Sequence, residues 1–283
     1  GDYGLAVQER AELIMLSDIA GYVGADTCGC LLAIRQDQQE EISLMIDIGT
    51  NGEMVLGNRE RMVTCSTAAG PAFEGAKIEC GMRGAAGAVD HVKYEDGKWN
   101  YTTVGNKPAV GLCGSGLIDL VAGLLDAGML DENGVLRSGQ EKQGVFILVP
   151  PERGGNERGV YLTQKDLGEV QLAKAAIAAG IQMLMERLGI TEDDICSVYI
   201  AGAFGNYMDP VSAGKIGLLP ATLVKKVKPV GNAAGEGAKI ALVNEKEMLE
   251  MDELVRKIEF VELAASADFQ DHFIDELGFE TGE

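Results

Sequence analysis

Histidine and basic residues are scarce in this sequence, and each scarcity argues against a class of function. Only His91 and His272 occur in 283 residues, too few for a multi-histidine metal site or a histidine relay. The 24 lysines and arginines are outnumbered by 44 acids, for a net charge of −20. Nucleic acids and anionic membranes both attract basic surfaces, so we expect neither as a partner.

Long apolar runs and dense cysteine spacing are also missing. No segment approaches the roughly 20 apolar residues of a membrane span. The acidic start, Gly1–Tyr3, lacks the apolar segment of a signal peptide, and glycine in place of methionine indicates a trimmed tag or an excised fragment. The six cysteines form no dense framework, which predicts reduced thiols in a cytoplasmic chain.

Three cysteines deserve a chemical interpretation of their own. Cys28 and Cys30 could ligate a metal or an iron–sulfur cluster, but no second pair follows at ligand spacing. Cys113 lies beside a glycine-rich loop and has no histidine near it in the sequence. We therefore interpret all three as small packing residues.

Glycine is abundant, with 38 residues, and 46% of the chain is hydrophobic. This composition is typical of a globular protein with closely packed elements and loops that approach a ligand. Strands are predicted at 43–57 (a hairpin), 61–66, 85–104 (two strands), 145–149, 195–201, 225–230 and 258–262. Helices are predicted at 31–34 after a glycine-punctuated turn at 22–30, at 117–128, and at 163–189, where Thr163 and Asp166 resemble a capping box and Gly189 ends the helix. Further helices are predicted from 210 onward and at 233–243, 249–257 and 267–276. This order predicts an α/β fold with a mixed sheet flanked by helices.

One hairpin is the most informative segment. An apolar run reaches Asp47, turns through Gly49, Thr50, Asn51 and Gly52, and resumes as a second apolar run. An acid, a hydroxyl and backbone N–H groups at such a tip suit the phosphates of a magnesium nucleotide. Asp47 is the candidate catalytic residue and would hold Mg²⁺ through water, while the four tip residues would contact phosphate. The alternative is a plain hairpin in which Asp47 caps its own turn.

A second glycine-rich segment precedes an apolar helix. Gly114, Ser115 and Gly116 open this helix, and the N–H groups at a helix start favour an anion such as phosphate. The alternative is an ordinary helix N-cap formed by Ser115.

A third segment, Gly202, Gly205 and Asn206, follows a buried strand. Its glycines would let an adenine or a ribose approach the backbone, although an ordinary strand–helix turn has the same composition. The small residues at 231–238 would allow two helices to pack closely, either at a hinge or in a plain helix pair.

Taken together and in this order, the loops resemble those of the acetate kinase/sugar kinase/Hsp70/actin superfamily. The sequences of the motifs resemble even more closely those of the reductive activators of corrinoid proteins. This resemblance extends from about residue 12 to 245. The matching motifs are Gly21–Thr27, Ile46–Glu53, Cys65–Ala76, Cys113–Asp119, Thr163–Asp166, Leu172–Ala176 and Ala201–Asn206. The sequence departs from the usual pattern at Ala25–Cys30 and at Ala203, where glycine is more common.

The resemblance implies an ATP-dependent electron transfer. Members of the family use ATP to drive an electron from a ferredoxin-type [2Fe–2S] cluster to an inactive Co(II) corrinoid, which restores Co(I). The cluster and a first phosphate loop normally lie upstream, and this sequence has neither. The chain therefore resembles the C-terminal part of a longer protein, with Asp47–Gly52 as its second phosphate loop. The implied fold is RNase H-like, of the actin-like ATPase type, and incomplete because the N-terminal half is missing.

The same resemblance supplies expectations for organisation, cofactors and partners. Residues 1–40 would be a helical and turn segment, 41–248 the ATPase-type core with an insertion at about 131–160, and 249–283 a helix–strand–helix. The expected cofactors are ATP and Mg, the partner is a corrinoid protein, and a homodimer is compatible. ATPase or redox activity is expected of the full-length protein, and the fragment alone need not have it. The alternatives are a small-molecule kinase of the same superfamily and a non-catalytic docking or dimerisation module.

Overall fold

The computed structural model describes residues 15–137, 144–264 and 266–279, with residues 4, 8 and 11 before them. Parts of three predicted segments lie outside these residues: the start of 1–40, the middle of the insertion at 131–160, and the last four residues of 249–283. In the described part of the chain, no helix has the length and apolar character needed to cross a membrane.

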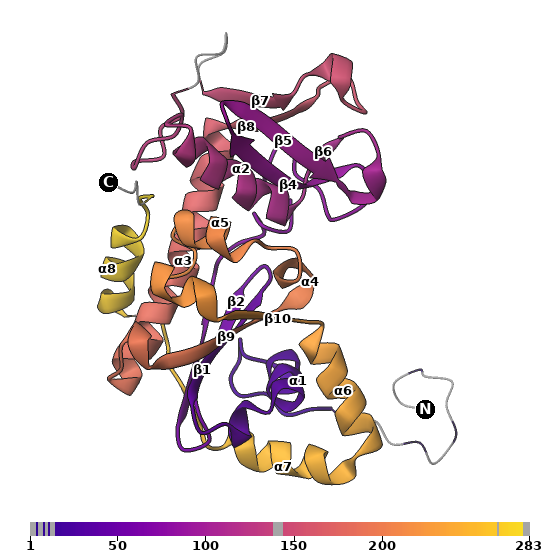
Figure 1. Cartoon of the computed structure of the whole chain (residues 1–283). Coiled ribbons are helices and arrows are strands. Elements are labelled where there is room, and N and C mark those ends of the chain that lie inside the picture. Colours follow the sequence, from indigo (N-terminus) through magenta and orange to yellow (C-terminus); the bar gives the residue numbers. More distant parts are fainter. Residues whose placement is uncertain are drawn as a thin grey trace.

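A six-stranded mixed sheet forms the lower half of the molecule (Figure 1). In spatial order its strands are β10 (Val227–Gly231), β9 (Ile195–Ala201), β1 (Ile42–Ile48), β2 (Gly52–Gly57), β3 (Met62–Thr67) and β11 (Ile258–Phe260). The strands β1, β2 and β3 form an antiparallel meander, whereas β9 and β10 run parallel to β1. The predicted mixed α/β sheet is confirmed.

The central strands are apolar on both faces because helices cover both. Leu44 and Ile46 of β1 belong to the main core, which also contains Ile177 of α3 (Gln164–Leu188). Met45 points to the opposite face, where it packs with Leu31. The elements on that face are α1 (Ala25–Ile34), α6 (Ala233–Val243) and α7 (Glu245–Val255). Side chains alternate along a strand, so Asp47 lies on the same face as Met45, toward α1.

The long helix α3 is specified by its caps. The Asp166 N–H donates to Thr163 Oγ1 (3.2 Å), and the Thr163 N–H donates to Asp166 Oδ2 (2.9 Å), which completes the predicted capping box. The helix ends at Gly189, whose φ of 70° lies in the left-handed region that favours glycine. Its outer side packs against α8 (Ala267–Asp275).

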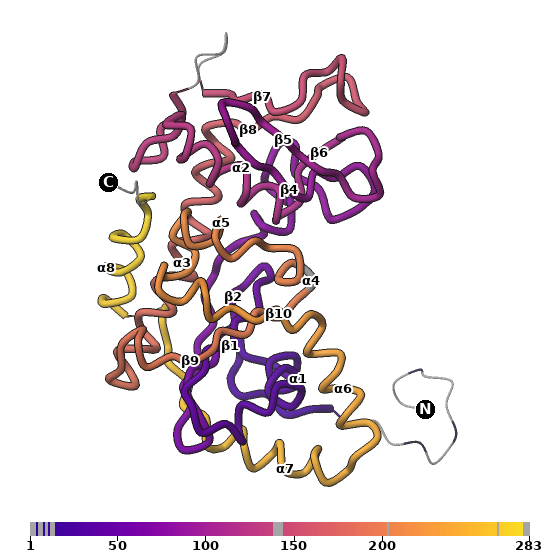
Figure 2. The backbone as a smooth tube through the Cα atoms, viewed as in Figure 1, coloured from indigo at the N-terminus to yellow at the C-terminus, as the bar shows by residue number. Residues whose placement is uncertain are grey.

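A second group of elements, the upper lobe, lies above the sheet in Figure 1. It consists of β4 (Ala88–Glu95), β5 (Lys98–Thr103), β6 (Gly111–Leu112), β7 (Val145–Val149), β8 (Val160–Thr163) and α2 (Gly114–Asp126). Figure 2 shows the backbone entering this lobe after β3 and returning to the sheet along α3. The two halves meet where α4 (Gly202–Gly205) and α5 (Pro210–Lys215) lie below α2.

Several element boundaries differ from the sequence-based prediction. The helix α1 starts at Ala25 and therefore contains Cys28 and Cys30, which were predicted to lie in a turn. The helix α7 runs from Glu245 to Val255 rather than from 249 to 257. The predicted turn after β9 is a single helical turn, α4. For α1 and α4, the tertiary contacts of small residues outweigh their weak local helix propensity.

Candidate functional site

Three parallel strands end side by side, and their carboxyl ends form the candidate site. In the sheet register, Asp47 of β1 lies beside Ala201 of β9, which in turn lies beside Gly231 of β10. Gly202 follows directly with a φ of 89°, and a methyl group there would lie 3.0 Å from Asp47 Oδ1. Glycine is required for both reasons, because the backbone is left-handed and the carboxylate is close.

The hairpin tip extends from this edge. The Gly49 N–H donates to Asn51 O (2.9 Å), so the turn closes on itself. Thr50 and Asn51 are exposed, and among the described residues their backbone N–H groups have no hydrogen-bond partner. Gly52 is different: it is buried, and a methyl group there would lie 2.9 Å from Thr67 Oγ1 and would also crowd α3. The tip therefore offers two N–H groups to a ligand, and Gly52 serves packing.

Three carboxylates, Asp26, Asp47 and Glu53, gather around this edge, and we call them the carboxylate cluster. Burial, followed by the negative charge of Asp26, raises the pKa of Asp47 above its ordinary value. Burial and the same neighbour also raise the pKa of Glu53, which pairs with Asp47 across the hairpin. In the described part of the chain, neither carboxylate forms an ion pair with lysine or arginine. The cluster therefore carries uncompensated negative charge.

The side chain of Asp47 faces away from its own turn. Its Oδ2 accepts a hydrogen bond from the Cys30 thiol of α1 (3.8 Å), an interaction that opposes the rise in the pKa of Asp47. The structure gives Asp47 no bond to the tip among the described residues, so a plain self-capped hairpin does not describe it. Cys30 links the carboxylate to the helix that covers this face.

The donor set decides which groups the site could hold. Among the described residues, no three histidine, cysteine, aspartate or glutamate side chains are arranged to bind a metal ion directly. Mg²⁺ held through water and phosphate oxygens remains compatible with Asp47 and its acidic neighbours. The cysteines do not fit an iron–sulfur cluster: Cys28 and Cys30 are buried in α1, and burial raises the pKa of Cys28 to about 12.

The segment after β9 joins the same edge. Gly205 packs on Ile200, where a methyl group would lie 2.5 Å from Cγ2. Asn206 is exposed, and its amide would lie 3.0 Å from a methyl group placed at Gly231. The third glycine-rich segment and the start of α6 thus lie together beside the hairpin.

The second glycine-rich segment lies packed inside the molecule. All three of its residues are buried at the start of α2. Gly114 lies against Phe73 O and Gly116 against Val89 O, where methyl groups would approach to 2.1 and 2.2 Å. Ser115 does not cap the helix; its hydroxyl donates to Asp90 O (2.8 Å). These residues fasten α2 to β4 and to the loop after β3, and their contact with phosphate stays a prediction.

A family model described as the C-terminal domain of RACo, the ASKHA domain, matches residues 41–283. The chain belongs to this family. The family predicted from the motifs is thereby confirmed. A solved structure of a "Reductive activator for corrinoid,iron-sulfur protein" superimposes with a TM-score of 0.87 at 40% identity, over 93% of this chain and 44% of that one.

Two curated relatives of the ASKHA domain bear functional names. The "Corrinoid activation enzyme RamQ" of Eubacterium limosum is 36% identical over 288 residues, covering 96% of this chain and 48% of that protein. The "[Co(II) methylated amine-specific corrinoid protein] reductase" of Methanosarcina barkeri is 29% identical over 303 residues, covering 99% of this chain and 54% of that protein. The chain spans about half the length of the curated relatives it matches.

Four residues of this ASKHA domain reach the edge without having been assigned to it from the sequence: Asp26, Cys30, Glu53 and Glu74. Of these four, only Glu53 could have been placed at the edge from the sequence. A tip at 49–52 places Glu53 opposite Asp47 by hairpin register alone. Asp26 and Cys30 arrive on a helix from another part of the chain, and Glu74 arrives on a loop, so no local pattern connects them to the tip.

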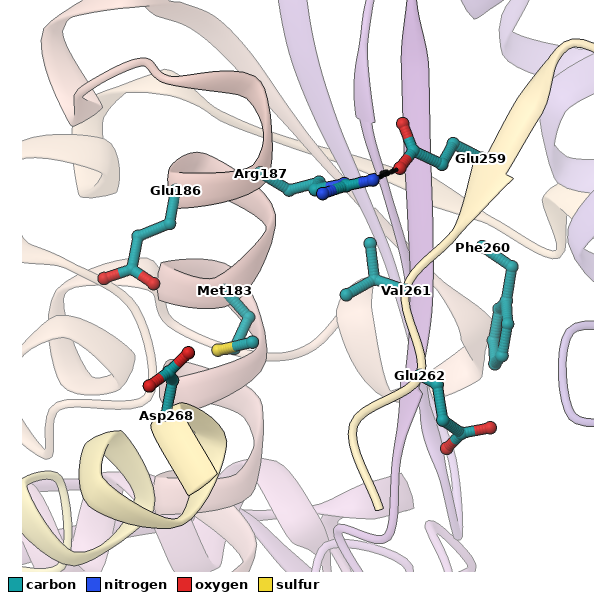
Figure 3. A pocket seen from close by; sticks show the side chains of 8 residues that line it. All are labelled: Met183, Glu186, Arg187, Glu259, Phe260, Val261, Glu262 and Asp268. Atoms are coloured by element: carbon teal, nitrogen blue, oxygen red, sulfur yellow. Dashed lines mark hydrogen bonds and ion pairs between the residues drawn. The ribbon is translucent and has the colours of Figure 1, made fainter. Parts of the chain in front are cut away.

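The ASKHA domain also has a surface groove of about 370 Å³ between α3 and β11, which we call the β11 groove. Figure 3 shows Arg187 of α3 reaching across it to Glu259. Its lining comprises Met183, Glu186, Arg187, Glu259, Phe260, Val261, Glu262 and Asp268. Arg187 and then Arg61, by hydrogen bonding to Glu259, hold the pKa of that carboxyl below its ordinary value. None of the hairpin-tip residues lines this groove.

Proposed function

We propose that this chain is the nucleotide-binding region of a protein that reductively activates a corrinoid protein, converting Co(II) to Co(I). The family and the names of two relatives and a structural neighbour support this function. Because the chain spans about half of those relatives, we assign the electron donor, a [2Fe–2S] cluster, to the rest of the full-length protein. The cysteines described above supply no alternative site for it.

The observation that carries the proposal is the hairpin tip beside Asp47, at the edge where three parallel strands end. In open α/β sheets this is where ligands bind. The N–H groups of Thr50 and Asn51 would donate to phosphate oxygens. Gly202 and Asn206 would border the adenosine, because both lie at the same edge. Gly114, Ser115 and Gly116 are buried, so a phosphate contact there would require the start of α2 to move away from Phe73 and Val89.

The uncompensated charge of the carboxylate cluster makes Mg²⁺ necessary for this binding mode. A nucleotide phosphate placed beside Asp47 and Glu53 would meet like charge in a partly buried site. Mg²⁺ supplies the counter-charge when it is bound to the nucleotide. Asp47 would then orient its water ligands, and the Cys30 thiol would keep that carboxylate directed toward the helix-covered face.

Nucleotide binding would contribute to reduction through conformation. Reduction of Co(II) to Co(I) is uphill with a physiological donor, so a second free-energy source is needed. Nucleotide binding or hydrolysis can provide it if the two conformations of the activator differ in affinity for the Co(II) and Co(I) forms of the partner. The domain would therefore act as the switch, and the corrinoid cobalt is the substrate of the full-length protein.

Calorimetry with Mg-ATP tests the nucleotide part of the proposal. We expect heat of binding with Mg-ATP and a much weaker signal with ATP in EDTA. No heat at millimolar nucleotide would sink the proposal for this chain and favour a docking or dimerisation module. Phosphoryl transfer to an added small molecule would instead indicate a kinase.

The partner is tested by titrating a Co(II) corrinoid protein into the chain with and without Mg-ATP. We expect the affinity to depend on the nucleotide, and an affinity that ignores it would contradict the switch. Light scattering on the same samples measures whether the chain forms the proposed homodimer.

A further inference from the structure

Glu74 lies over the hairpin tip. The loop after β3 folds back on the tip, and its Gly70 N–H donates to Thr50 O (2.8 Å). Four residues later, Glu74 Oε1 accepts a hydrogen bond from the Thr50 hydroxyl (3.0 Å). A methyl group at Gly49 would lie 3.6 Å from the same oxygen. A carboxylate oxygen therefore already occupies the position beside Thr50 where a phosphate oxygen would accept a hydrogen bond.

A carboxylate and a phosphate cannot share this position. Both are anions and both use the same hydroxyl donor, so each excludes the other. The nearest basic residue in the loop, Lys77, does not neutralise Glu74 because it forms an ion pair with Glu169 (3.2 Å). Glu74 is exposed, so its carboxylate can move into water when an anion arrives.

We propose that Glu74 is an anion gate on the hairpin tip: its carboxylate holds the Thr50 hydroxyl in the absence of nucleotide, and a nucleotide phosphate displaces it. This assignment rests on the proposed nucleotide binding. It adds a residue that opposes binding, whereas the other tip groups favour it. The ligand class is a polyphosphate anion, because a phosphate oxygen accepts from the same hydroxyl and its charge repels the carboxylate.

The gate is connected to the junction between the lobes. The neighbouring Phe73 stacks its ring on Phe204 of α4, with centroids 5.7 Å apart and planes inclined by 14°. Its carbonyl oxygen packs against Gly114 at the start of α2. Displacement of Glu74 therefore takes place next to a segment that touches both halves of the molecule. Nucleotide occupancy at the tip would reach the upper lobe by this route.

Calorimetric titration of Mg-ATP into the chain and two variants tests the gate. Glu74→Gln keeps an acceptor for Thr50 and removes the charge, whereas Glu60→Gln removes an exposed charge from the β2–β3 turn. We expect Glu74→Gln to bind Mg-ATP about three- to tenfold more tightly than the wild type. The affinity of Glu60→Gln for Mg-ATP should lie within about twofold of the wild-type affinity. The advantage of Glu74→Gln should narrow in about 1 M salt, because salt screens exposed charges.

Three results would overturn the gate, and they differ in what they say of nucleotide binding. If the wild type binds Mg-ATP and Glu74→Gln binds equally well, Glu74 does not compete with phosphate. If Glu74→Gln binds more weakly with Mg²⁺ but not in EDTA, Glu74 assists the metal instead. If none of the three proteins binds at millimolar nucleotide, the gate and the nucleotide-binding function fail together.

Discussion

The carboxylate cluster and the β11 groove are both acidic, yet the protein treats their charge in opposite ways. In the groove, Glu259 is paired with Arg61 and Arg187, and its pKa is lowered. At the cluster, Asp47 and Glu53 have no such partners in the described part of the chain, and burial raises their pKa values. Paired acids stabilise a surface modestly, whereas buried unpaired acids are unfavourable for folding. Groups that are unfavourable for folding and lie at a strand edge are candidates for a functional site, which is why we propose one here.

Glu259 of the groove therefore has its charge partners within the chain, whereas the described part of the chain provides none for Asp47 and Glu53. A cation from outside would complete the cluster, as Mg²⁺ does for a bound nucleotide. The substitutions below test this contrast, from the largest expected effect to the smallest.

The strongest test moves α1, which carries Asp26 of the cluster and the thiol that bonds to Asp47. A methyl group at Gly237 of α6 would lie 1.8 Å from Gly29 O of α1, so Gly237→Ala must push apart the helix that carries Asp26 and Cys30. We expect a loss of about 1–3 kcal/mol in the free energy of unfolding, measured with urea, together with weaker nucleotide binding.

Gly168→Ala is the matched control, because this helical glycine of α3 has open space around it. It should gain about 0.5–1 kcal/mol from the higher helix propensity of alanine. Equal stability of the two variants would contradict the close packing of α1 on α6.

Asp47→Asn separates stability from function. The amide keeps the shape of the carboxylate and removes a charge that burial disfavours, so we expect a higher Tm. Mg-ATP binding should weaken by more than about tenfold, or 1.4 kcal/mol, in calorimetry. A variant that is less stable and binds normally would show that Asp47 serves only the fold.

The pH dependence of stability should have opposite signs in the two regions. The ionised carboxylate of Asp47 destabilises the folded state, because its pKa is raised there. This effect is absent below the ordinary pKa of 3.8 and grows as the pH rises from there through the folded-state pKa. The pKa of Glu259 is lowered in the folded state, so its ionised carboxylate stabilises the fold. This stabilisation is fully present above the ordinary pKa of 4.5 and is lost as the pH falls through the folded-state pKa. Urea unfolding at pH 7 and near pH 4 should show Asp47→Asn losing most of its effect at the lower pH. The effect of Arg187→Gln should disappear only when the pH falls below the folded-state pKa of Glu259.

Arg187→Gln tests the groove itself. It removes one partner of Glu259 and leaves Arg61, so we expect Tm to fall by only about 1–2 °C, and less in high salt. Nucleotide titration should give the wild-type affinity. A clear change in that affinity would mean that the groove and the hairpin tip are coupled.

The smallest expected effect is at Cys30. Cys30→Ala removes the thiol that donates to Asp47, and we expect about threefold weaker Mg-ATP binding. Cys30→Ser keeps a donor and should restore the affinity. Equal binding by the two variants would show that the thiol acts through packing alone.

Local patterns were sufficient for the elements with strong local chemistry. The capping box at Thr163 and Asp166 and the glycine end at Gly189 predicted the limits of α3, and the structure confirms them. The hairpin and the helix at 233–243 were predicted for similar reasons. The start of α1 was missed because its small residues have weak helix propensity, and packing against α6 decides its conformation.

The sequence by itself determined the α/β class, the hairpin with Asp47 before its tip, and the family. These follow from hydrophobic periodicity, turn residues and motif sequences, which are all properties of residues that are neighbours in the chain. Only the tertiary structure decided which groups surround that tip. The helix α1 brings Asp26 and Cys30 to the tip, and the loop after β3 brings Glu74. Contacts with Phe73 and Val89 decide that Gly114 and Gly116 pack closely at the start of α2. Long-range contacts depend on how whole elements pack, and no local pattern encodes them.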